Sequence, residues 1–312
     1  MQDPGARRIV CALAGYLGDR KQSLSCAQMV PVFGYYFHGG FYPLGGSGKL
    51  ADVLAETIRE RGSEVRLHAR VERIVVERGR AAGIVLGDGT RIDCRAVVSN
   101  ADVKRTFLEL VEPRHLPSDF LARVKAARPA NSAFMVHLGV DFVPDTRPAL
   151  HVSGEPDVAI EVLSLVDPSA APPGHSTVGI VTLLPHEEAR TWFPAGASGS
   201  RDDWRQSTEY AERKSTFGDR LIAAAEKVMP GLSAHIVLRT DASPVTYARY
   251  DWASDGSIYG VSSSGRLNGP KSPIPGLVVA GSAAQGAGVE AAVISGALVA
   301  KALAPGLFRP RA

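Results

Sequence analysis

A glycine-rich loop near the C-terminus is the part of the sequence best suited to bind a ligand. The loop spans Gly281–Gly288 (GSAAQGAG) and lies between a short apolar strand, Leu277–Ala280, and a helix that begins at Val289. A helix N-terminus presents unpaired backbone N–H groups and the positive end of the helix dipole. Glycines in front of it let the backbone approach a phosphate or an electron-rich ring closely. The alternative is that these glycines serve only tight packing between strand and helix.

A second glycine cluster occurs in the segment Tyr42–Leu50 (YPLGGSGKL). Gly46, Gly48 and Ala51 match the GxGxxG/A pattern of dinucleotide-binding turns. A proline and pairs of glycines interrupt the preceding residues, so we expect no strand there and reject a dinucleotide-binding turn. We also reject a P-loop, because Lys49 is followed by leucine rather than serine or threonine. The segment remains a candidate for a helix N-terminus that faces a ligand.

An aromatic segment, Phe33–Tyr42 (FGYYFHGGFY), overlaps the start of this cluster. Its rings, among them Tyr36 and Tyr42, could form a wall that holds a flat apolar molecule by dispersion and stacking. The alternative is an aromatic cluster of the core. His38 lies beside two glycines and titrates near neutral pH, so it is either an acid–base group or a hydrogen-bonded structural histidine.

Other reactive side chains do not form a recognisable metal or nucleophile site. The HEE segment at 186–188 has no second histidine at metal-ligand spacing, so no zinc site is expected. The serines at 262–264 lack the GxSxG elbow of a hydrolase. Cys11, Cys26 and Cys94 form no CxxC pair, which disfavours a disulfide framework and favours a reducing cytoplasm.

The composition is that of a globular α/β protein. Of the 312 residues, 45% are hydrophobic and 21% are charged, and the net charge is only +3. No basic stripe indicates a nucleic-acid partner. The 32 glycines and 21 prolines favour a sheet-rich protein with many turns. The apolar stretch Gly276–Pro305 is broken by glycines, and its helical half is shorter than the roughly 20 residues that a membrane span needs. We therefore predict a buried strand, turn and helix there.

The periodicity of apolar residues predicts the elements that position these segments. A helix with one apolar face is expected over Gly48–Arg61, formed by Leu50, Val53, Leu54 and Ile58. Asn100 and Asp102 are expected to start a later helix. Between these helices we expect short strands at Val65–His68, Val71–Val76, Ala81–Leu86, Thr90–Cys94 and Ala96–Ser99. An Asp-Gly turn precedes the fourth of these strands. A middle region adds a long helix around Leu221 and strands at Ala133–Val140, Val158–Val166, Thr177–Leu184 and His235–Arg239.

Taken in order, several of these segments resemble the flavin amine-oxidase-like superfamily, and within it the phytoene desaturases, carotenoid isomerases and retinol saturases. The matching segments are Tyr42-Pro-x-Gly-Gly-x-x-x-Leu50, Arg70–Ile74 (RVERI), Val97–Asp102 (VVSNAD) and Gly276–Gly281 (GLVVAG) leading into Gly286-Ala-Gly288-Val289. In that family the RVERI-like strand meets the adenine of FAD, and the last segment lies along the flavin and its pyrophosphate. The segment Pro244–Gly260 also resembles the stretch that leads back into the flavin domain.

The resemblance implies an α/β fold class: a partial FAD-binding Rossmann-like domain of the glutathione-reductase type, with an inserted α+β antiparallel-sheet substrate domain. The implied domains are 1–42, the helical and aromatic part of the substrate region; 43–105, a helix plus β-meander of the FAD domain; 106–255, the substrate-binding domain; and 256–312, the C-terminal FAD-domain segment.

The resemblance also implies site residues. FAD would be bound by Gly45, Gly46, Arg70, Val71, Gly281, Ser282, Gln285, Gly286, Ala287, Gly288 and Val289. The substrate would contact Tyr36, His38, Tyr42, Tyr250 and Trp252. No metal is implied, and no side chain stands out as a catalytic acid or base.

The implied reaction is hydride exchange between FAD and a C–C bond of an apolar isoprenoid- or carotenoid-like substrate. An apolar substrate also implies peripheral contact with a membrane surface. Family members begin with a strand–GxGxxG–helix unit that the sequence does not contain, so we expect an N-terminally incomplete chain, self-association or a partner chain that supplies the unit. One alternative is a non-catalytic remnant or an apolar-ligand-binding subunit without FAD. Another is a flavin amine oxidase, with Tyr250 and Trp252 in an aromatic cage.

Overall fold

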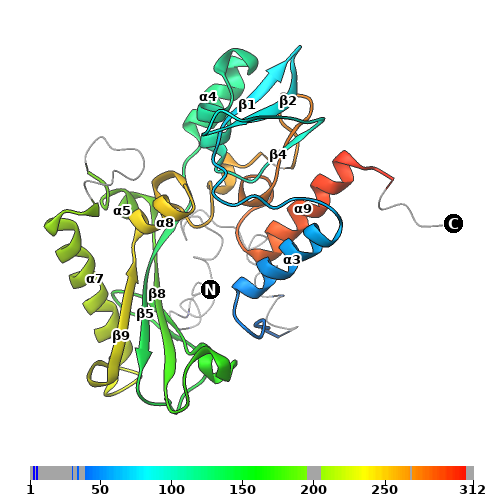
Figure 1. Ribbon diagram of the computed structural model, residues 1–312. Coiled ribbons are helices and arrows are strands. Elements are labelled where there is room, and N and C mark those ends of the chain that lie inside the picture. The colour runs from blue at the N-terminus through cyan, green and yellow to red at the C-terminus, as the bar shows by residue number, and fades with distance from the viewer. Residues whose placement is uncertain are drawn as a thin grey trace.

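The computed structural model of the chain contains two hydrophobic cores, one beneath a five-stranded sheet and one beneath two smaller sheets (Figure 1). It describes residues 39–194, 205–267 and 269–306, together with Asp3, Gly5, Val30 and Gly34. The chain builds strands of one core, passes through the whole of the other, and returns to the first for its last strand and helix.

A five-stranded antiparallel sheet in the order β6-β7-β8-β5-β9 organises the first core. Its strands are β5 (Ser132–Val140), β6 (Ala149–Val152), β7 (Val158–Glu161), β8 (Ser176–Leu184) and β9 (Ile236–Ala242). Helix α7 (Thr208–Glu226) covers one face of this sheet (Figure 1). The helix begins at Ser207, whose hydroxyl accepts the Tyr210 N–H at 3.2 Å, and Leu221 is fully buried against the sheet. The short helices α5 (His186–Arg190) and α8 (Pro244–Tyr250) complete this part.

The second core lies beneath two smaller sheets. One is the antiparallel meander β1 (Val71–Glu77), β2 (Arg80–Leu86) and β3 (Arg91–Asp93). The other is a parallel pair, β4 (Val97–Ser99) and β10 (Leu277–Val279), whose strands come from distant parts of the sequence. The π-helix Arg105–Leu110 (η3) and helix α4 (Ser118–Ala126) cover this core. Their rings Phe107 and Phe120 pack edge to face at 4.8 Å between centroids.

Two further helices, α3 (Gly48–Glu60) and α9 (Val289–Leu303), present their apolar side chains to solvent. No residue of α3 is buried, and the predicted apolar face is 44–53% exposed at Leu50, Val53, Leu54 and Ile58. In α9 only Ser295 and Val299 are buried. The prediction that the C-terminal helix is buried is therefore wrong for the described chain, although the strand before it, β10, is buried as expected.

The sequence located most strands correctly, with some corrections. Residues 65–68 form no strand, because His68 adopts a left-handed conformation with φ of 53°. The strand expected over Val158–Val166 ends at Glu161 and is followed by a 3-10 turn, Leu163–Leu165. The Asp-Gly turn joins β2 to β3 as predicted, with Gly89 at φ of 85°. None of the helices in the described ranges is long and apolar enough to cross a membrane.

Candidate functional site

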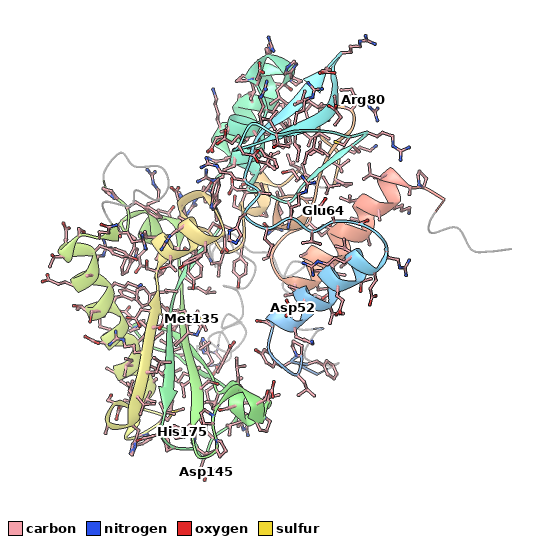
Figure 2. All side chains as sticks on the ribbon, in the orientation of Figure 1. Asp52, Glu64, Arg80, Met135, Asp145 and His175 are labelled. Atoms are coloured by element: carbon pink, nitrogen blue, oxygen red, sulfur yellow. The ribbon has the colours of Figure 1, made fainter. Side chains whose placement is uncertain are left out.

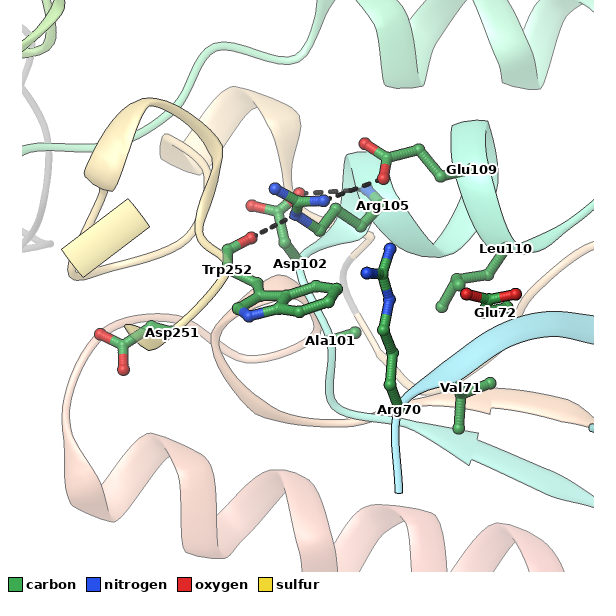
Figure 3. A pocket seen from close by; sticks show the side chains of 10 residues that line it. All are labelled: Arg70, Val71, Glu72, Ala101, Asp102, Arg105, Glu109, Leu110, Asp251 and Trp252. Atoms are coloured by element: carbon green, nitrogen blue, oxygen red, sulfur yellow. Dashed lines mark hydrogen bonds and ion pairs between the residues drawn. The ribbon is translucent and has the colours of Figure 1, made fainter. Parts of the chain in front are cut away.

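A cavity of about 520 Å³ lies where the part built on the five-stranded sheet meets the part built on the two smaller sheets (Figure 3). We call it the junction cavity. Its walls come from the start of β1, the loop after β4, the π-helix and the segment that follows α8. Two arginines, four carboxylates and an indole ring share this space. The lining residues are Arg70, Val71, Glu72, Ala101, Asp102, Arg105, Glu109, Leu110, Asp251 and Trp252.

Trp252 is the central ring of this cavity and is held from two sides. Its backbone is left-handed, with φ of 55°, and its carbonyl accepts the Nε–H of Arg105 at 2.6 Å. The guanidinium carbons of Arg70 and Arg105 lie 4.5 and 5.2 Å from the ring centroid, within cation–π range. Arg105 also pairs with Glu109 at 2.9 Å, whereas Arg70 has no carboxylate within ion-pair distance in the described residues. Arg70 therefore remains available to an anionic or aromatic ligand.

The segment that follows Trp252 is tied to both parts of the molecule. Asp102 caps the helical segment that begins at residue 103 and continues into the π-helix. Its Oδ1 accepts the Lys104 N–H at 2.8 Å, which confirms its predicted role at a helix start. The same carboxylate accepts the N–H and the hydroxyl of Ser254, at 3.0 and 2.9 Å. From the other part, His186 Nε2 lies 2.8 Å from Oδ2 of Asp255. That hydrogen bond is the main reason that the pKa of Asp255 lies below its ordinary value, against the opposing effect of burial.

The glycine loop between β10 and α9 forms a second candidate contact for a ligand. Gly281 packs so closely against Asn100 that a Cβ there would lie 1.9 Å from Oδ1 of Asn100. Its N–H donates to the buried Ser295 hydroxyl at 2.7 Å, which fixes the loop to α9. At the other end Gly288 has φ of 98° and open space where a Cβ would point, and no side chain caps the helix. Gly288 and the first residues of α9 are exposed, so the start of this helix is accessible to a ligand.

The glycine turn before α3 is held by the other part of the molecule. Gly45 and Gly46 both have positive φ, and the Gly45 N–H donates to Oδ2 of Asp167 at 2.6 Å. Asp167 caps the 3-10 turn Pro168–Ala170 (η6), and its pKa is lowered first by the hydroxyl of Ser169 and then by the Gly45 amide. The Gly45 amide, predicted to bind a cofactor, is thus engaged by a carboxylate within the protein.

The face of the five-stranded sheet opposite α7 forms a further candidate surface. Register places Ala159, Val181, Met135 and Ala242 in one row across β7, β8, β5 and β9, and all are partly exposed. In the next row, Gly179 separates Glu161 from His137. The missing side chain at Gly179 leaves a flat strip beside Met135, whose methyl carbon would lie 3.0 Å from a Cβ there. Figure 1 shows that this face looks toward α3 and α9 rather than toward α7.

The structure brings some of the predicted site residues together and separates others. Arg70, Val71 and Trp252 share the junction cavity. Tyr250 is 71% exposed and lines a different cavity, so the described residues do not form the aromatic cage of Tyr250 and Trp252 that an amine oxidase would need. Tyr42 is partly buried beside the glycine turn. Tyr36 and His38 lie outside the described residues. The other predicted FAD contacts lie in the loop between β10 and α9 and at the first residue of α9, and they do not line the junction cavity. They are Gly281, Ser282, Gln285, Gly286, Ala287, Gly288 and Val289.

Sequence reasoning missed Arg105 and Glu109 as cavity residues and assigned Asp102 only a capping role. The four-residue spacing of Arg105 and Glu109 is the signal that a sequence offers for their ion pair. No local pattern predicts that Arg105 reaches a carbonyl 147 positions away.

Solved structures with low sequence identity show the same fold. The crystal structure of an oxidoreductase from Methanosarcina mazei superimposes with a TM-score of 0.72 at 17% identity, covering 96% of this chain and 65% of that chain. Cyclohexylamine oxidase from Brevibacterium oxydans gives a TM-score of 0.56 at 16% identity, covering 99% of this chain and 66% of that chain. The described chain therefore has a mixed α/β fold that matches flavin amine oxidase structures and contains antiparallel sheets.

Sequence comparison identifies the family. The chain is 30% identical to the prolycopene isomerase of Daucus carota over 275 residues, which cover 83% of this chain and 42% of that protein. It is 27% identical to a lycopene-forming phytoene desaturase of Pseudescherichia vulneris, covering 67% of this chain and 43% of that protein. The chain thus spans less than half the length of these two curated relatives. Because residues 2–304 also match the family of flavin containing amine oxidoreductases, the chain belongs to that family, on its carotenoid isomerase and desaturase side.

Proposed function

We propose that this chain supplies the substrate-binding part, residues 106–255, and later segments of a Rossmann-like FAD domain, residues 43–105 and 256–312, of an FAD-dependent oxidoreductase. The reaction would be hydride exchange with a C–C bond of an apolar isoprenoid- or carotenoid-like molecule. The observation that carries the proposal is the flat, partly exposed apolar row on the sheet face opposite α7, in a chain whose relatives are named for lycopene chemistry.

The described residues fit part of an FAD molecule. The open N-terminus of α9 and the positive-φ glycines Gly286 and Gly288 suit an anionic oxygen or the edge of a flavin ring. In the junction cavity Val71 and Arg70 would hold the adenine end, with Trp252 as a neighbouring ring. Bound FAD would supply the hydride chemistry, and the protein would orient it and exclude water. Gly45 would contribute to FAD binding only indirectly, since its N–H already donates to Asp167.

The apolar sheet face would hold the substrate. Ala159, Val181 and Met135 offer a surface without charge on which a polyene can lie flat. Glu161 and His137 border the glycine strip and would set the polar limit of that surface. Tyr36, His38, Tyr42 and Trp252 remain proposed substrate contacts, as does Tyr250, which lines a separate cavity. We propose a cytoplasmic protein in peripheral contact with a membrane, because the substrate would be apolar.

A nucleotide-binding unit would complete the FAD domain. A parallel sheet is usually covered on both faces, whereas Val98 of β4 is 48% exposed and the apolar side chains of α3 and α9 face solvent. We propose that a further strand–loop–helix unit covers these surfaces, supplied elsewhere in the same polypeptide, by a second copy or by a partner chain.

The visible absorption spectrum of the purified chain after incubation with FAD and desalting tests the proposal. We expect a flavin spectrum that survives desalting, and its loss in Gly288→Ala, because a methyl group at φ of 98° strains the loop. Gly89→Ala is the matched control, since Gly89 also has positive φ and open space but lies in the β2–β3 turn.

Equal flavin retention by both variants would remove the glycine loop from the cofactor site. A wild-type chain that stays colourless, and also fails to bind a polyene in a Trp-quenching titration, would contradict the proposal. A colourless chain that binds the polyene would instead favour an apolar-ligand-binding subunit without FAD.

A further inference from the structure

A second cavity, of about 630 Å³, lies beside α8 and shares no lining residue with the junction cavity. It is bounded by the first turns of α7, the end of β9 and helix α8. Four cationic side chains and one carboxylate line it, together with several hydroxyl groups. The lining residues are Arg205, Tyr210, Ala211, Lys214, Ser215, Arg239, Thr240, Asp241, Thr246, Arg249 and Tyr250.

One of these cations is fully engaged and forms the floor of the cavity. Arg239 donates from Nε and Nη2 to Asp241, at 2.8–3.2 Å, and from Nη1 to Asp219 at 2.6 Å. Its remaining Nη2 bond goes to the Ser215 carbonyl at 3.0 Å. Arg239 is matched by two carboxylates, Asp241 of the lining and Asp219 outside it, so the four lining cations still exceed these carboxylates by two charges.

Lys214 and Arg249 are the unmatched charges. Within the described residues neither has a carboxylate at ion-pair distance; each lies instead against an aromatic ring. The Lys214 ammonium is 5.9 Å from the Tyr210 centroid, and the Arg249 guanidinium is 5.1 Å from the Tyr250 centroid. Lys214 is half-buried, and that burial is the main cause that lowers the pKa of its ammonium. The carboxylate of Asp241 partly offsets this effect of burial, and a partly desolvated cation without a direct ion pair still gains from an anionic ligand.

We propose that this cavity binds a phosphate-bearing small molecule, with the phosphoryl oxygens on Lys214 and Arg249. A phosphoryl group offers several oxygens that accept charge-assisted hydrogen bonds from an ammonium and a guanidinium together. The neighbouring hydroxyls of Ser215, Thr240 and Thr246 add donors of the same kind. The volume exceeds that of a phosphate ion and falls in the range of small-molecule sites, so the ligand carries an organic part that packs against Tyr250. This site contains none of the proposed FAD contacts and, of the proposed substrate contacts, only Tyr250.

Isothermal titration with sodium pyrophosphate, at ionic strength held constant with chloride, tests this proposal. We expect binding by the wild-type chain and weakening by about tenfold or more in Lys214→Met and in Arg249→Met, because each removes charge-assisted hydrogen bonds. Lys227→Met is the matched control, since Lys227 is an exposed lysine that follows the same helix and lies outside the cavity. A urea melt of each variant establishes that it is folded.

Sedimentation with vesicles then distinguishes a lipid headgroup from a free phosphate ester. Retention on phosphatidylglycerol but not phosphatidylcholine vesicles, lost in Lys214→Met, would assign the phosphate to a lipid. Pyrophosphate binding without selective vesicle retention would assign it to a soluble phosphate ester. The proposal is overturned if the wild-type chain does not bind pyrophosphate, or if Lys214→Met and Arg249→Met bind it as Lys227→Met does.

Discussion

The long helices of the two parts differ in what they cover. Helix α7 buries six of its residues, Tyr210, Gly218, Leu221, Ile222, Ala224 and Ala225. Helix α3 buries none, and α9 buries only Ser295 and Val299, although both contain many apolar side chains. The part with the five-stranded sheet is therefore a closed core, whereas the part with β4 and β10 has two helices whose apolar faces lack a covering layer in the described chain. An amphipathic helix indicates that a partner surface exists, without locating it.

Truncating matched leucines gives the largest expected contrast between these parts. Leu221→Ala in α7 should lower the free energy of unfolding by about 2–5 kcal/mol, because it leaves a cavity in a packed core. Leu54→Ala in α3 should change it by less than about 0.5 kcal/mol, because Leu54 is 53% exposed. Urea denaturation of the two variants measures both values. A loss at Leu54 that approaches the loss at Leu221 would mean that the face of α3 is packed in solution.

Helix glycines should shift stability in opposite directions in the two parts. At Gly218 in α7 a Cβ would lie 2.2 Å from Nη2 of Arg239 and 2.6 Å from Oδ2 of Asp241. Gly218→Ala should therefore destabilise by about 1–3 kcal/mol through overpacking. Gly296 in α9 has open space around it, so Gly296→Ala should stabilise by up to about 1 kcal/mol through helix propensity. Thermal unfolding distinguishes the two signs. Destabilisation by Gly296→Ala would show that something packs on α9.

The link between the parts should depend on pH through Asp255. Its lowered pKa means that the folded state prefers the carboxylate, so this stabilisation is present above the unfolded value of about 3.8 and is lost as pH falls through the folded value. Asp255→Asn should cost about 1 kcal/mol at pH 6, and the difference from wild type should shrink below pH 4. Asparagine suits the left-handed backbone at this position, where φ is 50°. Urea melts across this pH range measure the effect, and a constant difference would argue against it.

The smallest expected effect concerns the contact between Gly45 and Asp167. Asp167→Ala removes the acceptor of the Gly45 N–H and should change global stability by about 1 kcal/mol or less. Hydrogen exchange should nevertheless accelerate at Gly45 and at the start of α3, while protection of β5 and β8 stays unchanged. Equal acceleration in β5 would indicate that the two parts unfold together.

The sequence predicted elements well where local patterns decide them. Alternating apolar residues predicted β8, and the Asp-Gly turn predicted the β2–β3 connection. Strands β4 and β10 were each expected as apolar runs bounded by glycine or by a helix start, whereas their parallel pairing was not predicted. These signals are local, so they do not depend on what the rest of the chain does.

The candidate site was less predictable, because distant segments and unusual backbone conformations form it. A tryptophan with positive φ is rare. No neighbouring residue predicts the left-handed backbone at Trp252, and the ring of Trp252 and that of Tyr250 lie in different cavities. The cavity residue Arg105 depends on a carbonyl from a remote segment. The exposure of Leu54 could not be deduced from its spacing, since the same pattern describes a buried face.

The position of Trp252 also makes it an optical reporter of the junction. Trp252 is 41% exposed and its ring lies against two guanidinium groups that come from different segments. Trp192 is buried in the other core beneath the single guanidinium of Arg213, and Figure 2 shows how densely side chains fill both parts. Any shift of Arg70 or Arg105 changes the polarity around the indole and therefore its emission wavelength. A flavin in the neighbouring cavity would quench the same emission by energy transfer, so one fluorescence trace would follow both the relative motion of the two parts and the arrival of a cofactor.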